Sequence, residues 1–314
     1  MALQRNKHKI IHLSQTTSTN SYAKKYIEEH QAGEGTIIVA HEQTSGRGYG
    51  ENTWESEPGK NLTFSLILYP VFIKAADFFR ISQFVSLGLV DVLEKHLSEG
   101  ISIKWPNDIY YKDDKIAGIL IENSILRDKI DSSVIGVGLN VNQEVFAHAP
   151  NPVSLKQITG KEYDLEILLE EMVRSILNRY DQMKQDEENT NRNEQMKKVE
   201  GMPKQNDHLN KDGGMPPRSD QMNKDREMLP RSDQMNKDRE MLPRHNQLNN
   251  KGGNRIHMDY IKRIYRIHEY HFFMAGSKRF KARIVDVSSD GTIELQTQNG
   301  TIYHFGFKEV EYIV

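Results

Sequence analysis

The sequence predicts an α+β chain, in which a larger domain of mixed strands and helices is followed by a small all-β domain. Three observations predict it. Apolar runs of strand length alternate with segments of helical periodicity as far as residue 183, whereas residues 274–314 contain only short strands between tight-turn signals. Between these regions lies a polar stretch whose composition matches neither.

Runs rich in Val, Ile and Leu are predicted to be the strands of the larger domain. They cover residues 36–41, 62–68, 101–105, 116–122 and 134–141. Helices are predicted at residues 18–29, 75–97, 165–183 and 260–272, because apolar side chains recur there at every third or fourth position. Ser18 or Thr19 is expected to cap the first of these helices.

The C-terminal segment is predicted to contain three strands, at residues 280–287, 292–296 and 301–305. They are separated by Asp290-Gly291 and Asn299-Gly300, two dipeptides that favour the tight turns of β-hairpins. We therefore expect residues 274–314 to form a small β-barrel or meander packed against the larger domain.

Residues 185–254 form the polar stretch. They include no aromatic residue and 5 of the 10 prolines, so they cannot bury enough apolar surface to offset their ordering entropy. The 13-residue string at 218–230 recurs identically at 231–243, but two polar copies are too few for a solenoid. We predict a disordered or loosely helical insertion, a passenger that divides the larger domain into residues 1–184 and 255–273.

Composition narrows the class of protein. Lys and Arg number 42 and Asp and Glu 44, so the formal net charge is −2 and favours neither a nucleic acid nor a membrane-surface partner. The absence of Cys excludes disulfide frameworks, thiolate metal sites and thiol nucleophiles, and fits a reducing compartment. No run approaches the roughly 18 apolar residues of a membrane span. We expect a soluble, cytoplasmic protein.

A glycine-rich loop, Gly46-Arg47-Gly48-Tyr49-Gly50, follows the strand at residues 36–41 and Gln43. Its glycines let backbone amides approach an anion, and Arg47 can bind a phosphate or a carboxylate. It is not a Walker loop, because no Gly-Lys-Ser/Thr follows, and it opens no helix as a Rossmann loop must. Taken alone, the loop is better explained as an ordinary connection with a solvent-facing Arg.

A second polar segment, Lys104-Trp105-Pro106-Asn107-Asp108, ends the strand at residues 101–105, and Lys115 follows a turn-forming Asp113-Asp114. This pattern favours a hairpin that presents both lysines at one rim, where they can share an anion. Taken singly, each residue fits a core, turn or solvated position equally well or better. Two further segments are Ser18-Thr19-Asn20 and the strand containing Gly136 and Gly138, where glycine indicates either close approach of another group or a bulge.

Together, in this order and spacing, these segments resemble biotin protein ligases, enzymes that activate biotin with ATP and attach it to a lysine of a carrier protein. The likeness covers residues 14–158 and, more weakly, 165–183 and 260–314. It rests on Ser-Thr-Asn, the Gly-Arg-Gly loop, Lys-Trp-Pro-Asn-Asp, Lys-x-Ala-Gly-Ile-Leu-x-Glu and Gly-x-Gly-x-Asn, which are highly specific as a set. The resemblance implies a mixed β-sheet flanked by helices and a small C-terminal β-barrel. Only 17 residues precede Ser18, which suggests a short form without the N-terminal DNA-binding domain.

The resemblance also implies a role for individual residues. Those implied to bind biotin are Ser18, Thr19, Asn20, Gln43, Gly46, Arg47, Gly48, Tyr49, Lys115 and Gly118. Those implied to bind ATP are Arg47, Trp54, Lys104, Asn107, Lys115 and Asn140, with Asn107 and Asn140 also near Mg²⁺. The implied catalytic residues are Lys115, Arg47 and Asp108: the two cations offset charge as a carboxylate attacks phosphate, and Asp108 orients or deprotonates the carrier lysine.

The implied cofactors are ATP and Mg²⁺, with biotin as substrate, and the implied partner is a biotin carboxyl carrier protein or domain of a biotin-dependent carboxylase. A homodimer stays open. A lipoate or octanoate ligase of the sister family is one alternative, and a biotin-binding regulator without catalysis is another. A DNA-binding repressor is disfavoured because no basic face is evident.

The loop departs from the family pattern at one place. Tyr49-Gly50-Glu51 stand where the family usually has a basic or amide residue and further Arg and Gly. Each charge-assisted contact to phosphate is worth about 1.5 to 3 kcal/mol. We therefore expect the loop to retain biotinyl-adenylate less well than a Tyr49→Arg variant would.

Overall fold

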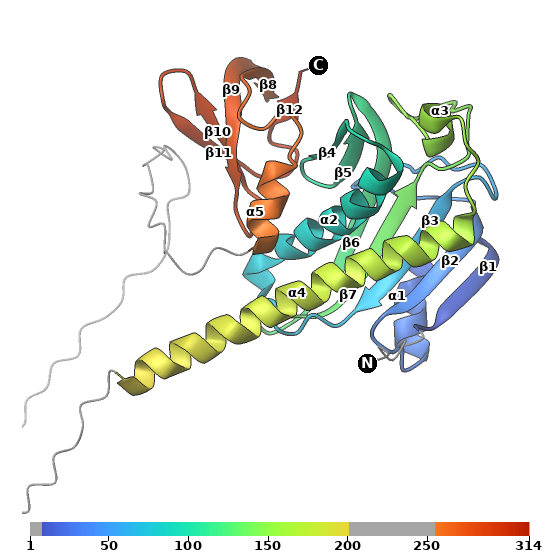
Figure 1. Ribbon diagram of the computed structural model, residues 1–314, viewed down its shortest axis with the longest axis horizontal. Helices are drawn as coiled ribbons and strands as arrows, with labels where there is room; N and C mark the ends of the chain where they lie inside the picture. Colours follow the sequence, from blue (N-terminus) through green and yellow to red (C-terminus); the bar gives the residue numbers. More distant parts are fainter. Residues whose placement is uncertain (1–7, 201–254, 314) are drawn as a thin grey trace, which may run out of the picture. The chain divides into compact units, whose positions relative to one another are not determined.

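The first domain is built on a seven-stranded mixed sheet, seen in the computed structural model, which describes residues 8–200 and 255–313 (Figure 1). The sheet order is β1-β2-β3-β7-β6-β5-β4; β1 and β2 are parallel and every other neighbouring pair is antiparallel. The strands are β1 Ile10–Thr16, β2 Thr36–Gln43, β3 Leu62–Leu68, β4 Ile101–Lys104, β5 Asp108–Tyr111, β6 Asp114–Leu126 and β7 Lys129–Leu139.

Helices cover both faces of this sheet, which is why β3 and most of β2 and β7 are buried along their length. One apolar cluster joins α1 (Thr19–Glu29) to Ile38 of β2, and the other joins α2 (Phe79–His96) to Ile37 and Val39. Successive residues of β2 thus point to opposite layers. The remaining helices are η1 Ala75–Asp77, α3 Leu155–Thr159, α4 Leu165–Glu200 and α5 Arg255–Lys262.

The helices α2 and α4 run side by side across the sheet in Figure 1, and a glycine sets their separation. A Cβ added at Gly88 of α2 would lie 2.7 Å from the Cα of Ile176 in α4. Any larger residue would force the helices apart, so Gly88 is a requirement of the packing. No helix within residues 8–200 and 255–313 combines the length and the apolar character needed to cross a bilayer.

The C-terminal segment forms a five-stranded antiparallel sheet in the order β11-β10-β9-β8-β12. Its strands are β8 His271–Ala275, β9 Lys278–Val287, β10 Ile293–Thr297, β11 Ile302–Phe305 and β12 Glu311–Tyr312. The two predicted hairpin turns are confirmed, with Gly291 at φ 86° and Gly300 at φ 89°. Glycine adopts this left-handed backbone without a Cβ penalty.

The core of the small sheet is continuous with that of the first domain. Phe273, Ile284 and Leu295 belong to the same buried apolar cluster as the core of the larger sheet. The indole Nε1 of Trp105, which follows β4, donates to the Gly291 carbonyl oxygen in the turn before β10 at 3.0 Å. The two sheets therefore share buried contacts and belong to one compact unit.

The predicted α+β class is confirmed, and most element positions agree, but one helix is wrong. Instead of a helix at residues 260–272, α5 ends at Lys262 and β8 begins at His271. Between them the chain pairs with β4, since the Ile103 amide donates to the Arg263 carbonyl at 2.7 Å. Arg266 and His268 then take positive φ values, 54° and 63°, which no helix accommodates.

Other differences concern elements that the sequence pattern did not signal. Strands β1, β5 and β12 are additional, and β8 lies in the C-terminal sheet although residues 255–273 were assigned to the first domain. Helix α4 continues to Glu200, so residues 185–200 of the predicted insertion are helical. The rest of that insertion, including both copies of the repeat, lies outside the described residues.

Candidate functional site

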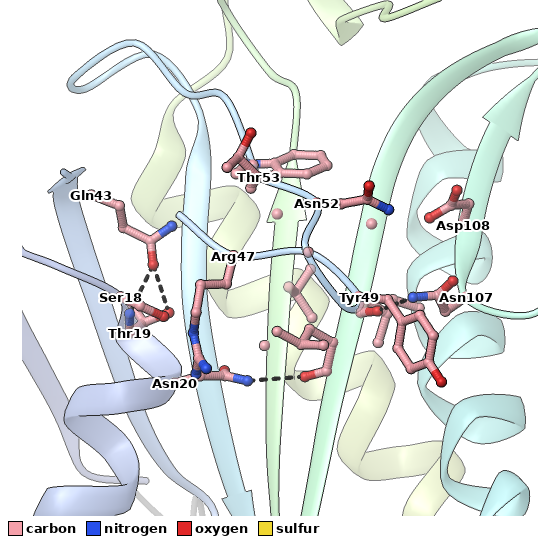
Figure 2. A pocket seen from close by; sticks show the side chains of 18 of the residues that line it. Ser18, Thr19, Asn20, Gln43, Arg47, Tyr49, Asn52, Thr53, Asn107 and Asp108 are labelled. Carbon is pink, nitrogen blue, oxygen red and sulfur yellow. Dashed lines mark hydrogen bonds between the residues drawn. The ribbon is translucent and has the colours of Figure 1, made fainter. Parts of the chain in front are cut away.

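A polar cavity opens on the α1 side of the sheet, among the ends of β2 and β5, the glycine-rich loop and the middle of β6 and β7 (Figure 2). Its walls contain twelve of the residues predicted for the site: Ser18, Thr19, Asn20, Gln43, Arg47, Gly48, Tyr49, Trp54, Asn107, Asp108, Lys115 and Gly118. Figure 2 shows Ser18, Thr19 and Gln43 at one end and Asn107 and Asp108 at the other. Segments far apart in the sequence thus meet around one space.

The first turn of α1 supplies the end of the cavity next to Gln43. The backbone N–H and the hydroxyl of Thr19 both donate to Gln43 Oε1, at 2.8 and 3.2 Å. Ser18 holds the N-cap position, but its side chain makes no capping hydrogen bond. The expected cap is therefore wrong for Ser18, and its buried hydroxyl lies in the cavity wall.

Asn20 is locked in place by the surrounding protein. Its Nδ2 donates to the Leu120 carbonyl at 3.1 Å and to Glu122 Oε2 at 2.9 Å, while its Oδ1 accepts from Ser65 Oγ at 2.6 Å. A Cβ at Gly136 would lie 2.4 Å from that Oδ1. Asn20 is thus a rigid part of the wall.

Glycines in β6 and β7 make room for the indole of Trp54. A Cβ at Gly138 would lie 2.2 Å from Trp54 Cε2, and one at Gly118 would lie 2.9 Å from Trp54 Cζ3. The β6–β7 register runs unbroken past Gly136 and Gly138, so close approach is the correct reading and the bulge alternative is wrong. Trp54 Nε1 is buried without a hydrogen-bond partner within the described residues.

Lys115 and Asp108 face each other at the far end of the cavity, on the neighbouring strands β6 and β5; of the two lysines predicted to share one rim, only Lys115 lines the cavity. Lys115 Nζ lies 2.7 Å from Asp108 Oδ1 and 5.7 Å from the centre of the Trp54 ring. Asn107 Nδ2 donates to the Ile119 carbonyl oxygen at 2.6 Å, which fixes the amide at the cavity edge. A cation, a carboxylate and an amide therefore converge beside an aromatic wall.

The glycine-rich loop is held at two points. Arg47 Nη2 lies 3.0 Å from Glu122 Oε2. The Tyr49 ring meets Phe307 of the C-terminal domain edge to face, with centroids 6.0 Å apart, and Lys308 Nζ lies 5.2 Å from the Tyr49 centroid. Glu122 and Phe307 were not among the predicted site residues. Glu122 follows Gly118 and Leu120 at the strand period of two, a signal that could have found it, whereas nothing in the sequence pattern singles out Phe307.

Three predicted residues do not line the cavity. Gly46 packs against the Trp54 carbonyl, where a Cβ would lie at 2.4 Å. Asn140 uses its amide N–H groups on the carbonyls of Lys115 and Val153, at 3.3 and 3.2 Å. Lys104 lies among the rings of Tyr110, Tyr265 and Tyr312, at 4.4 to 5.8 Å from their centroids. Burial lowers the pKa of Lys104, although the Asp108 carboxylate opposes this.

Cavity residues that were not among the predicted site residues are Asn52, Thr53, Ile119, Leu120, Gly136, Val137 and Gly138, although Ile119, Leu120, Gly136 and Gly138 lie within the motifs. Only Thr53 and Ile119 adjoin a predicted site residue in sequence, so the predicted residues located the site but not its full wall. In residues 8–200 and 255–313 no group of three or more His, Asp or Glu side chains is arranged to hold a metal ion.

Comparison with known proteins assigns the chain to a family. Residues 13–140 match the model of the biotin/lipoate A/B protein ligase family. The biotin--[acetyl-CoA-carboxylase] ligase of Paracoccus denitrificans is 32% identical over 167 residues, which cover 50% of this chain and 67% of that protein. The chain belongs to this family.

Longer members of the family also match. The bifunctional ligase/repressor BirA of Bacillus subtilis is 32% identical over 163 residues, 49% of this chain and 48% of that protein. The corresponding protein of Bacillus spizizenii is covered to 53%, so the chain spans about half the length of these curated relatives. Among solved structures, a biotin protein ligase from Aquifex aeolicus in complex with biotin and ATP has a TM-score of 0.63 at 20% identity. The alignment covers 97% of this chain and 99% of that chain, and confirms the expected fold.

Proposed function

We propose that this protein is an ATP-dependent biotin protein ligase, which forms biotinyl-5'-AMP and transfers biotin to a lysine of a biotin carboxyl carrier protein. The observation that carries the proposal is the cavity itself. It combines a polar end at Ser18, Thr19 and Gln43 with the Lys115–Asp108 pair, 2.7 Å apart, at the other end. Family membership and the relatives' names support biotin as the acid.

Each end of the cavity suits one part of the substrates. A ureido ring is small and polar, and needs converging hydrogen-bond partners inside an apolar slot. We assign this end to the residues predicted for biotin, with Asn20 fixing the wall and Trp54, Gly118 and Gly138 forming the slot. The carboxylate of biotin would then lie toward Lys115.

The first half-reaction joins two anions, so it requires fixed positive charge. The biotin carboxylate oxygen attacks the α-phosphorus of ATP, the bond to the bridging oxygen breaks, and pyrophosphate leaves. Lys115 and Arg47 both line the cavity and can offset the charge that gathers on the phosphate. Asn107, on the edge next to Asp108, suits the nucleotide side.

In the second half-reaction the carrier lysine attacks the acyl carbon of the mixed anhydride and AMP leaves. Asp108 Oδ1 is at the cavity surface beside Lys115 and can orient the amine or accept its proton. An Asp108→Ala protein should lose transfer from supplied biotinyl-adenylate. Transfer at the full wild-type rate would remove this role.

Magnesium would arrive with the nucleotide. Mg²⁺ is commonly bound through one or two carboxylates plus substrate phosphates and water. Asn107 and Asp108 offer oxygen donors at the cavity edge, whereas Asn140 is outside the cavity and Lys104 is enclosed by tyrosines. We therefore propose that Asn107 and Asp108 lie on the metal and nucleotide side of the site, and that Asn140 and Lys104 do not contact the nucleotide.

The test is ATP-dependent pyrophosphate release with biotin, lipoate or octanoate supplied separately, each with and without a biotin carrier domain. Release with biotin, followed by label on the carrier lysine, is the expected result. Release with lipoate or octanoate alone would move the chain to the sister activity. No pyrophosphate release with any of the three acids would indicate a binding protein without catalysis.

A further inference from the structure

Glu122 has no role in the reaction as described, yet its carboxylate joins three segments of the site. Its Oε1 accepts from Lys24 Nζ at 2.6 Å, and its Oε2 accepts from Asn20 Nδ2 at 2.9 Å and from Arg47 Nη2 at 3.0 Å. Lys24 and Asn20 belong to α1, and Arg47 belongs to the glycine-rich loop. The loop is thus tied to both the strand and the helix through one side chain.

The place of Glu122 in the sheet explains why it can do this. Gly118 and Leu120 of β6 line the cavity, and Glu122 is the next residue on the same face of the strand. It does not line the cavity, and its side chain is 21% exposed, so its charge is only partly screened. The carboxylate therefore lies next to the cavity and contacts Arg47, a cation that lines it.

The side chain of Glu122 is ionised in this position. Partial burial opposes ionisation, but the hydrogen bonds from Lys24 and Asn20 and the charge of Arg47 outweigh it and hold the pKa of Glu122 below 4.5. At neutral pH the group is a carboxylate facing two cations. Such charge-assisted contacts are among the stronger polar interactions in proteins.

We propose that Glu122 is a positioning residue that latches the glycine-rich loop over the cavity through Arg47, an inference that rests on the proposed ligase function. A guanidinium carries five N–H donors in a fixed plane. The contact to Glu122 uses one Nη2 donor, so the remaining donors stay available to an acyl-adenylate in the cavity that Arg47 lines. The latch orients Arg47 and slows escape of the intermediate.

The experiment compares Glu122→Gln with Lys24→Met. The first keeps the size of the side chain and removes the charge that holds Arg47. The second removes the other cation from the same carboxylate and leaves the loop contact intact, which makes it the matched control. Two properties are measured: the half-life of enzyme-bound biotinyl-adenylate, and the rate of trypsin cleavage after Arg47 in the ligand-free protein.

For Glu122→Gln we expect the half-life to fall by roughly tenfold or more and cleavage after Arg47 to accelerate, because a charge-assisted contact is lost. Lys24→Met should stay within about twofold of wild type in both, because Lys24 belongs to α1 and its removal leaves the Arg47–Glu122 contact to the loop in place. Equal effects in the two variants, or no effect in Glu122→Gln, would overturn the proposal. If Glu122→Gln does not fold, Glu122→Asp provides the test, with an intermediate loss expected and a wild-type result contradicting the latch.

Failure of the latch can be distinguished from failure of the proposed function. If wild type makes no adenylate from any acid, the ligase function fails, while trypsin cleavage after Arg47 still reports on the contact to Glu122. If wild type makes adenylate and the variant retains it normally, only the latch fails.

Discussion

Replacing Tyr49 by Ala should release the glycine-rich loop from the C-terminal domain. The Tyr49 ring is 42% exposed, and within the described residues its ring contacts are with the edge of Phe307 and the ammonium of Lys308. Tyr49→Ala removes both contacts and leaves the Arg47–Glu122 pair in place. The prediction is a shorter half-life for bound biotinyl-adenylate, since the loop closes less often.

The magnitude follows from the two contacts. An aromatic pair contributes about 0.5 to 1.5 kcal/mol beyond its buried area. A cation over an exposed ring contributes about 0.5 to 1 kcal/mol. If both act only in the closed loop, their sum is about 1 to 2.5 kcal/mol, which corresponds to a fall in half-life of roughly 5-fold to 70-fold. The lower part of that range is expected, because Tyr49 is 42% exposed.

The assay forms labelled biotinyl-adenylate on the enzyme, adds excess unlabelled biotin and follows loss of the bound label. Tyr49→Phe keeps the ring and serves as the control, with a half-life within about twofold of wild type. An unchanged half-life in Tyr49→Ala would refute the reasoning. Tyr49→Arg adds a comparison: longer retention would mean that the phosphate contact missing from this loop is worth more than the ring contact it replaces.

Three further predictions concern the wall, the insertion and pH. Gly138→Ala should lower biotin affinity and destabilise the fold by about 1 to 3 kcal/mol, since its Cβ would lie 2.2 Å from Trp54. Gly33→Ala is the control and should have neither effect, because its Cβ would have no neighbour closer than 4.0 Å. Calorimetry with titrated biotin would measure both effects. Replacing residues 201–254 by a short Gly/Ser linker should leave ligation and the melting temperature unchanged. The reason is that the contacts holding α4 lie outside that segment: Arg179 of α4 lies 2.6 Å from Asp91 of α2 and 3.0 Å from Asp259 of α5. Loss of folding would contradict the interpretation of the insertion as a passenger. Burial, with the charges of Asp108 and Asp114, raises the pKa of Tyr110 from 10.0 to about 12. The stability that this phenol contributes should therefore be complete below pH 10 and lost as pH rises through about 12. If Tyr110→Phe does not alter the pH dependence of alkaline unfolding, this prediction is wrong.

The sequence sufficed for the parts of the molecule that local rules determine. Strand β3 agrees in both bounds because it is an uninterrupted buried apolar run, and Gly291 and Gly300 signalled their turns because glycine adopts a positive φ without a Cβ penalty. The motifs located the cavity because they are short and specific. What failed depends on pairing across long separations: residues 263–265 read as helix but pair with β4, a choice made by a strand more than 150 residues away.

The same limit applies within the site. Lys104 reads as a rim cation, yet it is surrounded by Tyr110 and by two tyrosines from the C-terminal part of the chain, Tyr265 and Tyr312. Asn140 reads as a ligand residue, yet it secures the carbonyls of Lys115 and Val153. Both outcomes depend on contacts with residues outside the short motif that contains each side chain.

The hydrogen bond from Trp105 to Gly291 has consequences for thermal unfolding and for truncation of the chain. Since Phe273, Ile284 and Leu295 share a core with the larger sheet, the small sheet should not unfold ahead of it, and heating should give one calorimetric transition for both. A chain ending before β8 would expose Phe79 and Trp105, which pack edge to face against Phe307, and would lose the ring that Tyr49 contacts. Removing the C-terminal sheet would therefore remove a contact that holds the glycine-rich loop as well as part of the shared core.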